Sequence, residues 1–302
     1  MSLQEGELMS LQEDELKQKR TKLLLIGETG NGKSSLGNFI LQKNVFEVSG
    51  STKPVTKEVV KCFGKGDRSD VVVIDTPGFN GTDNFDNEHI QNIVNCVRVE
   101  GLQGIILTIN FHNHRFTDNI KQVIEIINDV FKIKDIWKHV CIVWTECENS
   151  LPQKQLEKGK KEKEQYKECL ISFINQINKT NEDIDIPMYF VDSQANEDFD
   201  NRRSEIEIER LIEWGRGLEL IDEEEIKKLI CEYKEIRYEE KKEKGKIIKE
   251  TEYSITYEIN TYRRCTKIKY NGEEIEGEWK LISTRTITEN KRNINQSDCV
   301  MV

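Results

Sequence analysis

Residues 27–34 read Gly27-Glu28-Thr29-Gly30-Asn31-Gly32-Lys33-Ser34. They follow an apolar run at 22–26, which indicates a buried strand, and they precede a stretch at 34–41 with the pattern of a helix. Glycines let backbone N–H groups approach a phosphate chain closely, and the positive end of the next helix faces it. The stretch therefore predicts a phosphate-binding loop, because a plain glycine turn between two elements does not need the other fixed residues.

A second apolar run, at 71–74, is followed by Asp75-Thr76-Pro77-Gly78. We expect Lys33 to reach the β- and γ-phosphates of a nucleotide, and Ser34 and Asp75 to bind Mg²⁺. In GTP-controlled switches a Gly at the place of Gly78 meets the γ-phosphate through its N–H. Taken alone, Thr-Pro-Gly also fits an ordinary turn.

A third apolar run, at 140–144, is followed by Thr145-Glu146-Cys147-Glu148. A carboxylate accepts both N–H donors on one edge of guanine, and adenine offers no such pair. We therefore predict that Thr145 and Glu148 belong to a guanine site. The pattern departs from the usual Asn-Lys-x-Asp and also fits a polar loop beside a helix cap. Asp192 and Ser193, after the run at 188–191, are predicted as weaker base contacts.

Four motifs resemble those of one known family. Residues 32–41 read Gly-Lys-Ser-Ser-Leu-Gly-Asn-Phe-Ile-Leu, which resembles the opening of the AIG/IAN/GIMAP-type GTPases, relatives of septins and of chloroplast Toc receptors. Val55-Thr56 is similar to the switch-I pair of that family, and Arg115-Phe116-Thr117 is similar to the end of its hydrophobic box. Thr145 and Glu148 also fit its base motif better than the Ras pattern. The resemblance covers roughly residues 20 to 220.

The resemblance implies a GTPase with GTP or GDP and Mg²⁺ as its cofactors. It implies that Thr56 senses the γ-phosphate and the metal, with Thr52 as the alternative residue. The predicted catalytic residues are Lys33 and Thr56, and the predicted metal ligands are Ser34, Thr56 and Asp75. The predicted nucleotide contacts are Gly27, Glu28, Thr29, Gly30, Asn31, Gly32, Lys33, Ser34, Ser35, Gly78, Thr145, Glu148, Asp192 and Ser193.

The order of the apolar runs predicts an α/β fold. Strand patterns lie at 22–26, 57–62, 71–75, 105–109, 140–144 and 187–191, and helical patterns lie at 34–41, 86–99, 117–131, 155–178 and 203–214. Such alternation favours a mostly parallel sheet covered by helices on both faces, with ligands at the carboxyl ends of the strands. We interpret the charged stretch 158–167 as the solvated face of a helix.

The composition changes near residue 221. Acidic residues at 222–225 and an irregular apolar stripe predict a long helix to about Lys249, and period-two runs from Tyr253, Thr266 and Trp279 predict a small antiparallel sheet with a turn at Asn271-Gly272. The predicted domains are a polar lead at 1–20, a GTPase domain at 21–220, a helix-and-sheet appendage at 221–290 and a tail at 291–302.

Composition excludes several other classes of protein. The 302 residues carry a net charge of −10, which disfavours general nucleic-acid binding. No apolar run is long enough to span a membrane, and the first twenty residues lack the apolar core of a secretory signal. The eight cysteines form no Cys-x-x-Cys pair, and His112 and His114 have no further ligand nearby, so a zinc site has little support. We expect a cytoplasmic or peripheral membrane protein.

The tail ends in Cys299-Val300-Met301-Val302, which matches a prenylation box, although a chance Cys in a frayed tail is the alternative. We expect lipidation of Cys299 to attach the protein peripherally to the cytosolic face of a membrane. One prenyl chain anchors only reversibly, so a second contact, such as oligomerisation, is needed.

The combined hypothesis is a GTP-binding switch at a membrane surface. Residues 79–81 read Phe-Asn-Gly and hold no Gln to orient the attacking water, so we predict slow hydrolysis. The resemblance suggests a homodimer or oligomer across the nucleotide face, where Arg115 or a partner subunit could assist. Two other hypotheses remain open, a membrane scaffold that nucleotide merely stabilises and an ATP-dependent enzyme.

Overall fold

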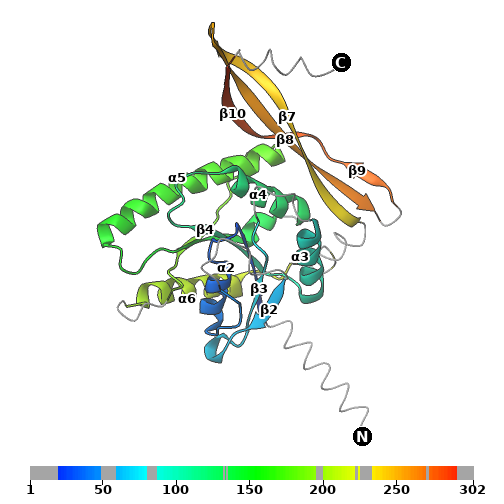
Figure 1. Ribbon diagram of the computed structural model, residues 1–302. Helices are drawn as coiled ribbons and strands as arrows, with labels where there is room; N and C mark the ends of the chain where they lie inside the picture. Colours follow the sequence, from blue (N-terminus) through cyan, green and yellow to red (C-terminus); the bar gives the residue numbers. More distant parts are fainter. Residues whose placement is uncertain are drawn as a thin grey trace. The chain divides into compact units, whose positions relative to one another are not determined.

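The computed structural model divides the chain into two compact units, Met1–Cys231 and Glu232–Val302, which are described separately (Figure 1). The structure describes residues 20–48, 59–79, 87–131, 133, 135–194, 200–221, 224, 233–269 and 272–290. The predicted lead at 1–20, apart from Arg20, and the tail at 291–302 with Cys299 therefore lie outside the described residues, as do Thr52 and Thr56.

The first unit contains a six-stranded sheet in the order β2-β3-β1-β4-β5-β6. Its strands are β1 (Thr21–Gly27), β2 (Val60–Phe63), β3 (Val71–Asp75), β4 (Gly104–Asn110), β5 (Val140–Thr145) and β6 (Met188–Phe190). All neighbours pair in parallel except β2, which runs antiparallel to β3 at one edge. This is the mostly parallel sheet that the sequence predicted.

Helices cover both faces of this sheet (Figure 1). They are α2 (Lys33–Leu41), α3 (Asn87–Glu100), α4 (Asp118–Val130), α5 (Gln153–Asn178) and α6 (Arg202–Gly217), with short 3₁₀ turns η1 (Gly66–Arg68) and η2 (Ile136–His139). Because each central strand is buried on both faces, its sequence is a continuous apolar run. The five predicted helices are confirmed, with ends that differ by a few residues.

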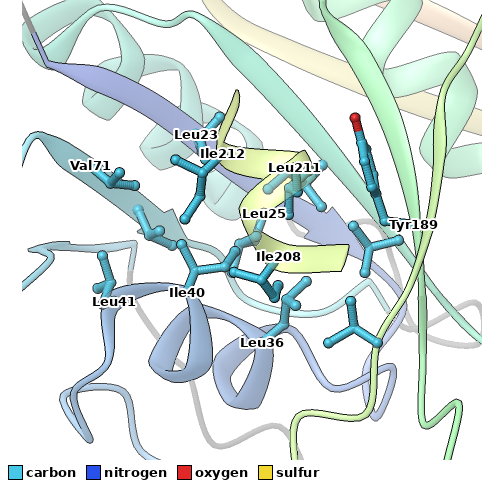
Figure 2. Close-up of a cluster of buried hydrophobic side chains, with 14 of the residues drawn as sticks. Leu23, Leu25, Leu36, Ile40, Leu41, Val71, Tyr189, Ile208, Leu211 and Ile212 are labelled. Atoms are coloured by element: carbon cyan, nitrogen blue, oxygen red, sulfur yellow. The ribbon is translucent and has the colours of Figure 1, made fainter. Parts of the chain in front are cut away.

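One hydrophobic cluster fixes α2 and α6 on the same face of the sheet (Figure 2). Leu23 and Leu25 point from β1 toward this face and are fully buried. Ile40 of α2 and Ile212 of α6 pack against them, also with no exposed surface. Burying side chains of this size stabilises the fold by about 2 kcal/mol each. The cluster holds the start of α2, and hence the phosphate loop, against the sheet.

The charged stretch of α5 is not entirely solvated, which corrects the interpretation of residues 158–167. Lys163 is only 1% exposed and its Nζ donates to the carbonyl of Asn113 at 2.7 Å. The ammonium also lies over the rings of Phe111 and Trp144, at 5.2 and 4.7 Å from their centroids. A buried Lys cannot be recognised within a dense run of Lys and Glu, because its partners come from distant loops.

The second unit is an antiparallel sheet in the order β10-β8-β7, with β9 paired to β8. Its strands are β7 (Tyr233–Glu250), β8 (Ser254–Lys269), β9 (Glu274–Glu276) and β10 (Lys280–Asn290). The small antiparallel sheet is therefore confirmed. The runs predicted from Tyr253 and Thr266 form one continuous strand, β8, rather than two.

The predicted long helix is wrong over residues 233–250, because this stretch forms β7. Pairing with β8 decides the outcome, and charged side chains join the two strands. The guanidinium of Arg263 donates to Glu240 at 2.6 Å, and that of Arg264 donates to Glu239 at 2.5 Å. Such cross-strand partners are invisible to local periodicity. Most of the acidic helix start at 222–225 lies outside the described residues.

Among the described helices, none is long and apolar enough to cross a membrane.

Candidate functional site

The phosphate loop runs from Gly27, at the end of β1, to Gly32, directly before α2. Two neighbouring strands hold it in place. The side-chain amide of Asn31 donates to the carbonyl of Thr108 at 3.1 Å, and the hydroxyl of Thr145 donates to the carbonyl of Asn31 at 2.9 Å. The loop is thus fixed by the carboxyl ends of β4 and β5, where ligands bind in sheets of this kind.

Lys33 begins α2 and is 6% exposed. Its Nζ donates to the carbonyls of Gly27 and Glu28, at 3.2 and 3.0 Å, so the ammonium lies inside the curve of the loop. Burial lowers the pKa of Lys33 to about 8, although the nearby carboxylates of Asp75 and Glu28 act in the opposite direction. A buried cation held by carbonyl groups suits an anionic ligand, which would compensate its lost hydration.

Ser34 and Asp75 are brought together as the sequence predicted. The Ser34 hydroxyl donates to Asp75 Oδ2 at 2.7 Å, and Asp75 is fully buried. A hydroxyl and a carboxylate are the hard oxygen ligands that Mg²⁺ prefers. The donor set therefore fits a magnesium ion beside the phosphate loop. Thr56 and its alternative Thr52 lie outside the described residues, so the predicted switch-I contact stays a prediction.

Gly78 lies directly against the phosphate loop. A Cβ atom placed on it would lie 2.5 Å from the Cα of Thr29 and 2.7 Å from its backbone nitrogen, so only glycine fits. The next residue joins the loop by two backbone hydrogen bonds, from Thr29 to Phe79 and from Phe79 to Gly27, both 3.2 Å long. The segment after β3 is therefore in contact with the loop where the γ-phosphate sensor is predicted.

The Arg115-Phe116-Thr117 motif also reaches the phosphate loop. Thr117 caps α4 by accepting a hydrogen bond from the amide of Ile120, and its hydroxyl donates to Glu28 Oε1 at 3.2 Å. Burial raises the pKa of Glu28 above its ordinary value, and the bond from Thr117 opposes this shift. Phe116 packs into the first unit and Arg115 is exposed. The motif thus links α4 to the loop and presents a cation at the surface.

The predicted base contacts lie in two neighbouring loops, after β5 and after β6. Glu148 Oε1 is 3.0 Å from Nε2 of His112, and its Oε2 is buried without a hydrogen-bond partner among the described residues. Thr145 is 1% exposed and supports the phosphate loop through its hydroxyl. Asp192 accepts a hydrogen bond from the amide of Asn149 at 3.0 Å, so its carboxylate braces the loop of Glu148.

A cavity of about 550 Å³ lies between α2 and the loop after β6. Ser35, Asn38 and Phe39 line it from α2, and Ser193 and Gln194 line it from the loop. Two predicted nucleotide contacts, Ser35 and Ser193, therefore face the same space.

Three side chains that support the site were missed by the sequence reasoning: His112, Lys163 and Arg203. Arg203, at the start of α6, donates to the carbonyls of Cys147 and Glu148. Each of these side chains contacts a partner that lies dozens of residues away in the sequence, and no local motif indicates that partner. The family-like Gly37-Asn38 pair could have been interpreted further, because Asn38 Oδ1 accepts from the amides of Val45 and Phe46 at 2.9 and 2.8 Å.

Comparisons with known proteins show which proteins this chain is similar to. Residues 21–158 match the AIG1 family. Over 136 residues the chain is 32% identical to "Immune-associated nucleotide-binding protein 13" of Arabidopsis thaliana, covering 44% of this chain and 40% of that protein. Over 128 residues it is 35% identical to "GTPase IMAP family member 8" of Rattus norvegicus, covering 41% of this chain and 18% of that protein. The match thus spans two fifths or less of these relatives.

Solved structures show the same fold. A dimerization-deficient mutant of Toc33 from Arabidopsis thaliana superposes with a TM-score of 0.55 at 19% identity, covering 67% of this chain and 86% of that chain. Toc33 in complex with Mg²⁺ and GMPPNP gives a TM-score of 0.50 at 20% identity, covering 67% and 88% of the two chains. The six-stranded unit therefore has a fold similar to that of Toc33, and the stretch 21–158 within it is similar to the AIG1 family.

Proposed function

We propose that this chain binds GTP and GDP with Mg²⁺ and acts as a switch that hydrolyses GTP slowly. The observation that carries the proposal is the hydrogen bond between Ser34 and Asp75, beside the buried ammonium of Lys33. It places two oxygen ligands and one cation at the start of a helix, which together suit a metal-bound phosphate chain. Relatives named as IMAP GTPases, and Toc33 structures with Mg²⁺, support the assignment.

Each residue has a distinct part in this proposal. Ser34 and Asp75 would hold Mg²⁺, which neutralises phosphate charge when bound. Lys33 and the backbone amides of residues 28–34 would hold the phosphates. Thr56 and the N–H of Gly78 would respond to the γ-phosphate, and its loss would release the segments that carry them.

Guanine is the proposed base because Glu148 offers a carboxylate at the loop after β5. One carboxylate oxygen has no hydrogen-bond partner among the described residues, and the side chain as a whole is 45% exposed, so the carboxylate keeps acceptor capacity and is open to a ligand. Guanine presents two such donors side by side, whereas adenine presents an acceptor at the same place.

A nucleotide titration tests the assignment. We expect GTP and GDP to bind in the presence of Mg²⁺ and ATP to compete poorly. Lys33→Ala should cripple triphosphate binding, and Glu148→Ala should weaken guanine nucleotides selectively. The proposal fails if folded protein with Mg²⁺ has no measurable affinity for guanine nucleotides, and equal affinity for ATP would favour an ATP-dependent enzyme.

Slow hydrolysis and assembly across the nucleotide face are the finer parts of the proposal. The sequence has no Gln at 79–81, and the exposed Arg115 could act on a partner subunit. In the similar chloroplast translocon components atToc33 and psToc159, dimerization is important for the GTPase activity. Single-turnover hydrolysis should therefore accelerate with protein concentration. A rate independent of concentration would exclude assistance between subunits.

Membrane attachment through Cys299 completes the proposed function, and it rests on the sequence motif alone. The test is incubation with prenyltransferase and a labelled prenyl donor, with Cys299→Ser as the control. Comparing vesicle binding of GTP- and GDP-loaded protein then separates a switch from a scaffold, because a scaffold would bind equally in both forms.

A further inference from the structure

The loop that carries Glu148 has a fixed backbone. Arg203 holds the carbonyls of Cys147 and Glu148, and the amide of Cys147 donates to the carbonyl of Val191 at 3.2 Å. The amide of Asn149, two residues after Cys147, donates to Asp192. The remaining freedom at this site is therefore in the Glu148 side chain, which has one more rotatable bond than an Asp and loses more entropy when it is oriented.

His112 contacts this side chain. Its Nε2 lies 3.0 Å from Glu148 Oε1, while Oε2 stays buried and has no hydrogen-bond partner among the described residues. An imidazole with its proton on Nε2 donates to Oε1 and leaves that oxygen a second lone pair. The carboxylate can thus accept from His112 and keep acceptor capacity on both oxygens.

The segment bearing His112 is itself anchored. The amide of His112 donates to Asn110 Oδ1 at 2.8 Å, and Asn110 Nδ2 donates to Glu146 Oε2 at 2.7 Å. One residue further on, the buried ammonium of Lys163 holds the carbonyl of Asn113. These bonds tie the loop after β4 to the loop after β5 and to α5, so the backbone that bears the imidazole is placed by the fold.

We propose that His112 is a specificity-determining positioning residue, which orients the Glu148 carboxylate so that it accepts both donors of a guanine base. The inference rests on the proposed function, because it requires a guanine nucleotide in the site. Glu146 stands where the Asn-Lys-x-Asp motif has Lys, and its carboxylate is engaged by Asn110.

The test compares GDP with inosine diphosphate, whose base lacks the exocyclic amino group and keeps the N–H beside it. Dissociation constants are measured with Mg²⁺ for the wild-type chain, His112→Ala, His112→Gln and His114→Ala. His114 is the matched control, because it lies on the same loop and contacts Glu162 of α5, at 3.3 Å, instead of Glu148.

The proposal expects the wild-type chain to prefer GDP, and His112→Ala to reduce this preference about three- to tenfold, the range for one hydrogen bond. His112→Gln, whose amide can still donate, should restore most of it, and His114→Ala should leave it unchanged. An unchanged preference in His112→Ala overturns the proposal. A tighter affinity for GDP in that variant also overturns it, because His112 would then compete with the base.

Glu148→Ala separates this inference from the proposed function. If wild-type protein binds guanine nucleotides and Glu148→Ala loses the preference for GDP while His112→Ala keeps it, only the role of His112 fails. If wild-type protein binds no guanine nucleotide, both fail.

Discussion

The Ser34 hydroxyl donates a hydrogen bond of 2.7 Å to Asp75 Oδ2, joining the start of α2 to the end of β3 across 41 residues of sequence. Both groups are held by regular elements rather than by loops. Their meeting is therefore a consequence of the parallel pairing of β1 with β3, which aligns the carboxyl ends of the two strands.

Replacing Asp75 by Asn should remove the magnesium dependence of triphosphate binding. The amide keeps the shape and can still accept from Ser34, but it lacks the charge that attracts a divalent cation. We expect Mg²⁺ to improve the affinity of wild-type protein for a non-hydrolysable GTP analogue at least tenfold more than it improves that of the variant. Calorimetric titration with Mg²⁺ and with EDTA measures this. Equal metal dependence in both proteins would contradict a metal site at Asp75.

Nucleotide affinity should fall as the pH rises past the pKa of Lys33, which burial lowers to about 8. Anionic phosphates favour the charged ammonium, so the bound state keeps the proton that the free protein loses above pH 8. Binding then requires proton uptake, and the affinity for GDP should fall about fourfold between pH 7 and pH 8.5. Lys33→Met is the control, since it should bind weakly without this additional fall. A flat profile for the wild-type chain would refute the shift.

Gly37→Ala should destabilise the first unit by about 1–3 kcal/mol. A Cβ at this position would lie 2.7 Å from the ring of Phe46, which is itself buried and cannot yield freely. Phe46→Leu in the same chain should recover part of the loss, because the smaller side chain leaves room. Denaturant unfolding of both single variants and the double variant measures the coupling. Additive effects would show that the two residues do not interact.

Lys163→Met should loosen the segment that carries His112 without unfolding the protein. The thioether fills the space of the Lys stem but cannot donate to the carbonyl of Asn113. We expect faster hydrogen exchange at the amides of 111–115, and a weaker preference for GDP over inosine diphosphate. Lys158→Met is the control on the same helix, because Lys158 is exposed and its ion pair among the described residues is a long one, 3.9 Å, to Glu162. Unchanged exchange in Lys163→Met would rule out this anchoring role.

The helices and strands of the first unit were predicted well because short, local sequence patterns specify them. Leu23 to Ile26 form a short apolar run with a glycine loop behind it, and such a run fits a buried parallel strand better than a helix. Ser34 and Asp75 were predicted as metal ligands from their two motifs, and the parallel pairing of β1 with β3 brings them to one edge of the sheet.

The sequence failed where distant partners decide the structure. Glu239 and Glu240 look like part of a solvated helix until Arg263 and Arg264 on β8 are placed opposite them. The local sequence gives Lys163 the pattern of a surface residue, and only the fold brings the carbonyl of Asn113 to its ammonium. His112 could not be assigned for the same reason, since its partner Glu148 is 36 residues away on another loop.

The order of the second sheet leaves β7 at one edge. An edge strand presents unused amide and carbonyl groups, and it can recruit another chain into an extended ribbon. Residues 239–246 read Glu-Glu-Lys-Lys-Glu-Lys-Gly-Lys, so seven of these eight positions carry a charge. A second copy paired in parallel and in register would bring like charges together, and pairing in any register would desolvate many ammonium and carboxylate groups at once. The charges that made this strand resemble a solvated helix in the sequence therefore oppose pairing of this edge with another chain.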